Sequence, residues 1–314
     1  MRLTAPWMAL LAAVSLLSGC IYVGDWGDSD AFKQDFHSNH PLDAGGRISV
    51  ESFNGSIDVT GWDQSSVEVN GTKHASFRDA LEDIKIDVNS TASSIRIRAI
   101  RGADRFRNEG VRFSLRVPRK AVLELISTSN GRIEVDSVEG KARLHTSNGG
   151  LRLLRLKGDF EAETTNGSID AQDLRGNANF HTTNGSVRAE AGGGSFEAVT
   201  SNGRIEVRLN DPAPGPVRLH SSNGHIELTL DSKQLPELRA STTNSSILLR
   251  IPPMSDARVR AYTSHSSSVT SEFGELRDDG DRRRRHSEFE GNIGHGGPLL
   301  ELETTNGAIK IQKL

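Results

Sequence analysis

The chain has 314 residues, of which 35% are hydrophobic and only 5% are aromatic. That composition is low for the thick core of a large globular domain, and helical periodicity is almost absent, so we expect an all-β fold. The formal net charge of −3 provides no bulk basic field and argues against nucleic acid as a partner.

The N-terminus predicts an export signal followed by a lipid anchor. Arg2 precedes an apolar run at residues 8–17, which is shorter than the roughly 20 residues of a membrane-spanning helix. The sequence LSGC, which ends at Cys20, then matches the lipobox of bacterial lipoproteins. We therefore expect residues 1–19 to be a lipoprotein signal peptide and Cys20, the only cysteine, to be lipidated.

The resemblance to bacterial lipoproteins implies several acyl chains on Cys20, and several chains together anchor a protein stably. Ile21 follows the cysteine in place of the aspartate that marks retention in the inner membrane. The outer membrane is therefore the expected location, on either its periplasmic or its surface face. Residues 20–44 are polar and lack periodicity, so we expect them to form a lipidated tether.

Alternating apolar residues begin at Gly45 and continue to about residue 118 in runs of unequal length. The first run contains an Asn-Gly pair at Asn54 and Gly55. Terminal units of a stacked fold must cover its open end. Residues 45–118 therefore predict an irregular N-terminal β cap.

From residue 119 onward, one short phrase returns at a fixed spacing. Its asparagine recurs with one constant spacing, at positions 130, 148, 166, 184 and 202, and then with a slightly longer one, at 223 and 244. A fixed short period indicates units that stack on one another, because one unit alone cannot bury an apolar face. The Asn-Gly pairs are Asn130 and Gly131, Asn148 and Gly149, Asn166 and Gly167, Asn184 and Gly185, Asn202 and Gly203, Asn223 and Gly224, and Asn306 and Gly307.

The charged residue of each repeat distinguishes two possible folds. Asn-Gly is also the usual turn of a two-residue hairpin, so an antiparallel meander is the alternative to a solenoid. The charged position is occupied in turn by Glu134, Arg152, Asp170, Arg188, Glu206 and Glu227. Alternating sign is favourable if these side chains are cross-strand neighbours, and a meander offers no reason for it. The pattern predicts a single-chain parallel β-solenoid, or β-helix, with 18–21-residue coils.

Strand parity assigns the side chains of each coil to the inside or the outside. We expect the asparagines at an inward corner, where their amides bridge adjacent coils. The glycine that follows is expected to adopt a positive φ for the bend. The predicted inward column consists of Thr128, Thr146, Thr164, Thr182 and Thr200.

The repeat pattern weakens after residue 251, and a charge block follows that contains Arg282–Arg285. One complete phrase returns at Thr304–Gly307. Residues 119–314 are thus predicted to be the solenoid, with a C-terminal cap over about 251–314 whose final coil covers the last open edge.

The repeated T-[ST]-N-G-x-[IV] coils and the closing segment from Gly291 to Ile311 resemble the bacterial putative-adhesin family of β-strand-repeat proteins. That family is related to the head domains of auto-transporter adhesins. The resemblance covers residues 45–314 and implies a β-solenoid protein of the cell envelope. It supplies no catalytic residues and no cofactor.

Histidines recur three residues before the corner, at His145, His181 and His220. His145 and His181 are two coils apart, about 9.6 Å at the usual strand spacing. A zinc ion binds its ligands at about 2 Å, so the pair cannot chelate one unless it shares Glu163. No metal site is predicted.

Glu134, Asp170 and Glu206 are the acidic candidates for catalysis on a β-helix. Glycoside hydrolysis needs two carboxylates at a defined spacing, whereas these alternate with arginine. The expected function is therefore a non-enzymatic envelope lipoprotein that acts as an adhesin or a structural surface. Its expected partners are the membrane and a glycan or protein ligand, with the oligomeric state left open. A carbohydrate-active enzyme and a periplasmic accessory component of an envelope-stress system are the alternatives.

Overall fold

The computed structural model describes residues 21–23, 32–102, 108–210, 215–232, 234–264, 268–274 and 286–314. The predicted signal peptide, Cys20 and Arg282–Arg285 lie outside these residues. Within them, strands dominate and the only helix is α1 (Arg78–Asp83), which has 6 residues. No helix in this described part is long and apolar enough to cross a membrane.

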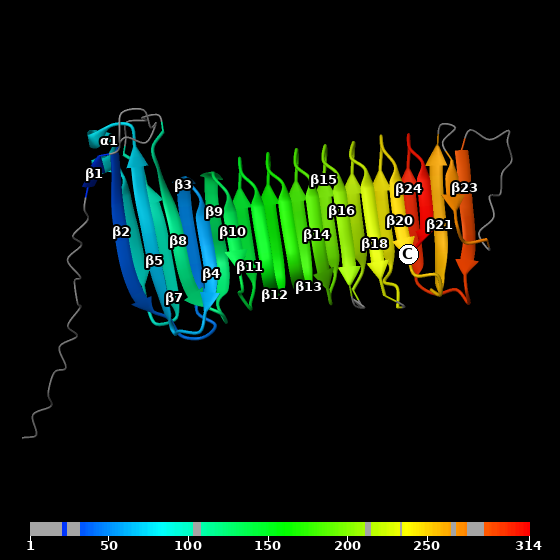
Figure 1. Cartoon of the computed structure of the whole chain (residues 1–314), viewed down its shortest axis with the longest axis horizontal. Helices are drawn as coiled ribbons and strands as arrows, with labels where there is room; N and C mark the ends of the chain where they lie inside the picture. Colours follow the sequence, from blue (N-terminus) through cyan, green and yellow to red (C-terminus); the bar gives the residue numbers. More distant parts are fainter. Residues whose placement is uncertain are drawn as a thin grey trace, which may run out of the picture.

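Two parallel β-sheets run along a rod, and each coil contributes one strand to each sheet (Figure 1). The strand before the Asn-Gly corner belongs to sheet 1, and the strand after it belongs to sheet 2. From the N-terminal end of the rod, sheet 1 contains β7 (Ser94–Ile100), β3 (Arg47–Asn54), β9 (Val122–Asn130), β11 (Ala142–Thr146), the second halves of β12 (Leu151–Thr164) and β13 (Ile169–Thr182), β15 (Phe196–Thr200), β17 (Val217–Ser221), β19 (Leu238–Thr242), β24 (Leu299–Thr304) and β21 (Ala257–Ser264). In the same direction, sheet 2 contains β8 (Gly110–Pro118), β4 (Ile57–Trp62), β10 (Ile133–Asp136), the first halves of β12 and β13, β14 (Val187–Gly192), β16 (Ile205–Asn210), β18 (Ile226–Asp231), β20 (Ile247–Ile251), β25 (Ile309–Lys313) and β22 (Val269–Ser271).

Each position of the repeat lies beside its own copy in the next coil. In sheet 2, Leu151 pairs with Ile169, and Ile169 pairs in turn with Val187 of the following coil. In sheet 1, Thr146 pairs with Thr164 in the same way. This parallel, in-register pairing confirms the predicted β-solenoid and excludes the antiparallel meander.

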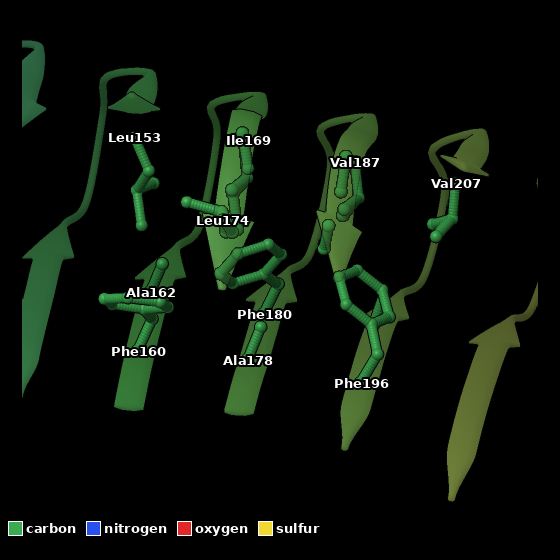
Figure 2. Close-up of a cluster of buried hydrophobic side chains, with 14 of the residues drawn as sticks. Leu153, Phe160, Ala162, Ile169, Leu174, Ala178, Phe180, Val187, Phe196 and Val207 are labelled. Atoms are coloured by element: carbon green, nitrogen blue, oxygen red, sulfur yellow. The ribbon is translucent and has the colours of Figure 1, made fainter. Parts of the chain in front are cut away.

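The thin core between the sheets alternates large and small side chains (Figure 2). Phe160, Ala178 and Phe196 follow one another in one column of sheet 1. In the neighbouring column the order is reversed, with Ala162 beside Phe180. The rings of Phe180 and Phe196 meet edge to face, with centroids 5.6 Å apart. Opposite phase in the two columns keeps the volume of each coil similar, which allows close packing along the rod.

The N-terminal cap begins with a true solenoid coil. β3 and β4 flank the corner at Asn54, which lies opposite Asn130 in the next coil. The chain then leaves the rod after residue 62, forms an outer coil from β7 and β8, and resumes the solenoid at β9 on the other side of β3. The predicted cap of residues 45–118 is therefore one regular coil followed by an excursion.

Antiparallel strands cover the N-terminal end of the rod. β6 (Lys85–Ser90) covers β7, while β5 (Ser66–Ala75) joins β8 to β2 (Phe32–Pro41), which pairs in turn with β1 (Ile21–Val23). The predicted tether is wrong for residues 32–41, because every residue of β2 pairs with β5. The segment contains no alternation of apolar residues, so backbone pairing to an open edge determines its structure.

The last coil in sequence is not the last coil in space. β24 and β25 lie between the coil of β19 and β20 and the coil of β21 and β22 (Figure 1). The prediction that Thr304–Gly307 closes the rod is therefore wrong. β21 is covered instead by the antiparallel strand β23 (His286–Ile293). A repeat pattern cannot specify this order, because every coil presents the same type of edge to its neighbour.

Candidate interaction surface

Stacked asparagines form a ladder along the corner between the two sheets. The Asn148 amide donates from Nδ2 to Oδ1 of Asn130 at 2.8 Å, and Asn166 donates to Asn148 at 2.7 Å. The same bond, at 2.7–2.9 Å, continues through Asn184, Asn202, Asn223, Asn244 and Asn306. These side chains are exposed, so their predicted inward position is wrong. The chain bends at the asparagine, and strand parity no longer applies there.

Where a glycine follows the corner asparagine, two backbones approach each other closely; after Asn244 this position is occupied by Ser245. A Cβ atom at Gly149 would lie 2.0 Å from the carbonyl oxygen of Gly131, and one at Gly167 would lie 1.7 Å from that of Gly149. The corresponding distance is 1.6–2.0 Å at Gly131, Gly185, Gly203, Gly224 and Gly307. Gly55, after Asn54 in the first coil, is the corresponding glycine of the N-terminal cap. Of all these corner glycines, which the structure describes, only Gly55 has a positive φ, at 109°. The predicted left-handed bend is therefore wrong for the others.

Buried hydroxyl groups donate to the carbonyl oxygens of the residues that follow the corner asparagines, which are glycines except for Ser245. Thr164 donates from Oγ1 to the carbonyl oxygen of Gly149, and Thr182 donates to Gly167, each at 2.9 Å. The column lies inside the rod, as predicted. It consists of Thr128, Thr146, Thr164, Thr182, Thr200, Ser221, Thr242 and Thr304, with bonds of 2.8–3.1 Å. Each hydroxyl satisfies a backbone acceptor of the neighbouring coil.

We expect Thr164→Val to lower the free energy of unfolding by about 1–3 kcal/mol. Valine preserves the shape of the side chain but leaves the buried carbonyl oxygen of Gly149 without its donor. Thr165→Val is the matched control, because Thr165 is exposed, and its effect should stay within about 0.5 kcal/mol. Urea unfolding followed by circular dichroism measures both variants. Equal effects would contradict a special role for the buried hydroxyl.

A row of hydroxyl side chains lies beside the asparagine ladder. It consists of Ser129, Ser147, Thr165, Thr183, Ser201, Ser222 and Thr243. From Asn148 onward, each ladder amide uses one N–H in the ladder, and the described residues provide no partner for its second N–H. The ladder and the hydroxyl row together form a polar strip whose hydrogen-bonding groups repeat about every 4.8 Å. Such a strip suits an extended polymer better than a small molecule.

The outer face of sheet 2 carries charges of alternating sign. Arg152 lies 3.9 Å from Glu134. Arg188 lies between Asp170, at 4.0 Å, and Glu206, at 3.3 Å. Each of the three carboxylates considered for catalysis thus has an arginine in at least one neighbouring coil. In the other neighbouring coil, Glu134 lies opposite Asp58 and Glu206 lies opposite Glu227. From Glu134 to Glu206 the alternating signs therefore neutralise charge between neighbouring coils.

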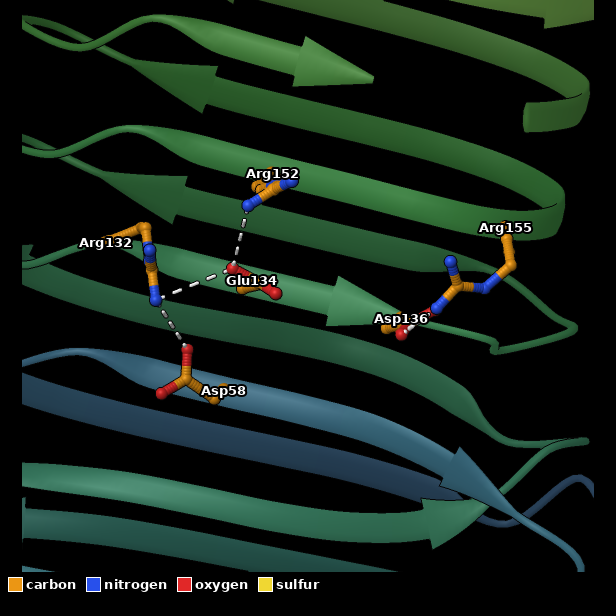
Figure 3. A network of polar contacts seen from close by, with 6 residues as sticks. All are labelled: Asp58, Arg132, Glu134, Asp136, Arg152 and Arg155. Carbon is orange, nitrogen blue, oxygen red and sulfur yellow. Dashed lines mark hydrogen bonds and ion pairs between the residues drawn. The ribbon is translucent and has the colours of Figure 1, made fainter. Parts of the chain in front are cut away.

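At the first coil of the rod the alternation ends, because Asp58 lies opposite Glu134, and Arg132 contacts both carboxylates (Figure 3). Arg132 lies 3.5 Å from Asp58 in β4 and 3.5 Å from Glu134 in its own coil. Arg155 pairs with Asp136 of the preceding coil. Both arginines are more than half exposed, so each pair contributes little to stability, on the order of 0–1 kcal/mol.

The histidine column lies on the outer face of sheet 1. His145 is opposite Glu163, with 3.6 Å between Nδ1 and Oε2, and Glu163 is opposite His181. His220 bonds to the hydroxyl of Ser241 at 2.9 Å. The described residues contain no group of three histidine, cysteine or acidic side chains placed to hold a metal ion.

One carboxyl group in the described part of the chain has a clearly raised pKa. The side chain of Glu109 is 2% exposed, and its burial raises its pKa, although Arg101 at 3.3 Å lowers it. Nearby Asp83 adds to the increase. Glu109 lies in the covered N-terminal cap, away from Glu134, Asp170 and Glu206 on sheet 2. Its raised pKa therefore reflects burial rather than an acid presented to a substrate.

Sequence reasoning missed the second corner of each coil, which returns the chain from sheet 2 to sheet 1. A Cβ atom at Gly158 would lie 2.2 Å from the carbonyl oxygen of Gly140, so this corner also has close backbone contact. Its glycines have φ between 125° and 151° and are Gly140, Gly158, Gly176 and Gly194. Their constant spacing along the chain, equal to that of the asparagines, is the signal from which the corner could be predicted.

The chain resembles one described protein family and several solved structures. The model of the family described as Toastrack DUF4097 matches residues 46–312. No curated protein matches the chain. A putative adhesin from Parabacteroides merdae ATCC 43184 is 10% identical, with 89% of this chain and 96% of that chain covered and a TM-score of 0.44. A putative adhesin from Bacteroides fragilis NCTC 9343 is 11% identical, with 89% and 97% covered and a TM-score of 0.31.

Proposed function

Since the chain belongs to the Toastrack DUF4097 family, we propose that it is a non-enzymatic lipoprotein of the bacterial cell envelope whose rod binds a glycan or protein. The observation that carries the proposal is the continuous polar strip of the asparagine ladder and hydroxyl row. Every coil with a corner asparagine adds one amide and one hydroxyl group to this strip, so affinity for a polymer would accumulate along the rod. A binding rod of this kind needs no convergent catalytic groups.

The N-terminal residues support attachment at one end of the rod. Cys20 directly precedes β1, and β1 pairs with β2 in the N-terminal cap. An acylated Cys20 would therefore hold this end close to the membrane and direct the other end away from it. Ile21 stands in place of the aspartate that marks retention in the inner membrane, and this supports a location in the outer membrane.

We expect Cys20→Ala to move the protein from the membrane fraction to the soluble fraction, because it removes the acylated sulfur. Ile21→Asp is the matched control and should leave the protein acylated but shift it to the inner membrane. Membrane fractionation after labelling with a radioactive fatty acid measures both variants. Unchanged fractionation of Cys20→Ala would contradict the lipid anchor.

The proposed binding function is tested by co-sedimentation of the purified full chain with isolated cell envelopes. A reducing-end assay on the same polysaccharide material tests the alternative of a carbohydrate-active enzyme. We expect saturable binding and no release of reducing ends. Turnover of a glycan would overturn the non-enzymatic proposal. Protease treatment of intact cells then determines whether the rod is displayed at the surface or in the periplasm.

A further inference from the structure

A polar groove of about 510 Å³ lies on the outer face of sheet 1 at the N-terminal end. Its floor comes from β3 and β7, and its sides come from β6 and β9. The lining includes Arg47, Ser49, Asn89, Thr91, Arg96 and Glu124. This part of the face is irregular because Glu124 is the extra residue of a β-bulge in β9, where the register with β3 shifts.

Two arginines occupy diagonal positions in the groove. Arg47 pairs with Ser94, which precedes Arg96 by two residues on the same face of β7. Such diagonal neighbours lie about 7–8 Å apart, so two guanidinium groups can contact one ligand from two directions. Arg96 is flanked by Ser49 on one side and Asn89 on the other, which provide a hydroxyl and an amide.

Neither arginine has a carboxylate within 4.0 Å among the described residues. Two residues further along β7, Arg98 lies 3.4 Å from Glu51. Further along the same sheet, Arg143 likewise pairs with Glu161 at 2.8 Å. Arg47 and Arg96 therefore differ from Arg98 and Arg143, whose charges are paired.

The charge balance of the groove favours an anion. Glu124 is the only acidic residue in its lining, against two arginines. Two further carboxylates on the strands that border the groove, Glu51 and Asp87, contact Arg98 and Asn89 respectively. Guanidinium groups bind carboxylate, sulfate and phosphate through paired N–H donors, and hydroxyl and amide groups complete such a site.

We propose that this groove binds the anionic groups of an acidic glycan, through Arg47 and Arg96. The inference rests on the proposed binding function, for which it names the ligand class and one site. The shared chemistry is a carboxylate or sulfate oxygen on a sugar, and the polar neighbours bind the adjacent sugar hydroxyls. The groove lies at one end of the rod, so it adds a charge-selective contact that the neutral polar strip lacks.

Isothermal titration calorimetry of the full chain at low salt tests the site with three probes: an oligogalacturonate, a dextran sulfate oligosaccharide and a neutral dextran oligosaccharide. We expect one or both acidic probes to bind and the neutral probe not to bind. Binding of the first alone assigns carboxylate, binding of the second alone assigns sulfate, and binding of both assigns a general anion site. The double substitution Arg47→Gln and Arg96→Gln should raise the Kd at least about 10-fold.

Arg218→Gln is the matched control, because Arg218 lies in sheet 1 several coils away and also lacks a carboxylate within 4.0 Å among the described residues. It removes a surface charge outside the groove and should leave the Kd unchanged. Equal weakening by Arg218→Gln, or no binding of either acidic probe, would overturn the site. If the protein still binds isolated envelopes in that case, the proposed function stands without this groove. If the acidic probes bind but isolated envelopes do not, the groove stands as an anion site and the proposed envelope-binding function fails.

Discussion

Gly149→Ala is expected to lower the free energy of unfolding by about 2–3 kcal/mol, at the upper end of the usual range for overpacking. The added methyl group would lie 2.0 Å from the carbonyl oxygen of Gly131, a rigid backbone atom that no rotamer change can move. The two coils must therefore separate locally, which weakens the asparagine ladder and the buried hydroxyl bonds at that level. A large effect from one methyl group is characteristic of close backbone contact.

The next residue provides the control for this substitution. A Cβ atom at Gly150 would lie 3.4 Å from the Ser168 carbonyl oxygen, which is close to ordinary contact. Gly150→Ala should therefore stay within about 1 kcal/mol of the wild type, because the lower entropy of its unfolded chain offsets the added contact. Denaturant unfolding of both variants measures the difference. Similar stability of the two variants would contradict close stacking of the corner glycines.

Deletion of residues 299–314 is expected to detach the C-terminal end of the rod. This segment forms the inserted coil and buries Leu300, Leu302, Ile309 and Ile311, each at most 1% exposed. At about 1.5–3 kcal/mol for each side chain, its removal costs roughly 6–12 kcal/mol of burial. It also opens the edges of β20 and β21, so we expect new protease cleavage in residues 252–293 and a lower Tm.

A synthetic peptide of residues 299–314 should restore protection to the truncated chain, because it can occupy the slot between β20 and β22. A peptide carrying Leu302→Asp and Ile309→Asp is the control, since it retains the length but places two charges in the core. Protease resistance and Tm of each mixture are the measurements. Full protection of residues 257–293 in the truncated chain alone would contradict the inserted coil.

Features that depend on stacking alone were predictable from the sequence. A fixed repeat length brings like positions together, so the alternation of Glu134 and Arg152 and the inward position of Thr164 follow from the period and strand parity. The β-solenoid fold follows from the same period. These features do not depend on where the chain leaves the rod and returns to it in the two caps.

Features that depend on the corner and on coil order were not predictable in this way. The asparagines point outward because the bend breaks strand parity, and Gly149 is required by its distance to Gly131 rather than by φ. The coil around Asn306 is inserted because identical edges permit either order of stacking. β2 is a strand through backbone pairing, which leaves no apolar pattern in the sequence.

Pulsed electron paramagnetic resonance between spin labels most directly tests whether the repeats stack in this order. In a Cys20→Ser background, one label is placed at Ser129 and the other at Thr243, Thr305 or Ser264. These positions lie six, seven and eight coils away, so about 4.8 Å per coil predicts separations of about 29, 34 and 38 Å. Ser264 should therefore be farther from Ser129 than Thr305 is, although it comes earlier in the sequence. A shorter distance to Ser264 than to Thr305 would contradict the inserted coil, and distances that do not increase from coil to coil would contradict the solenoid.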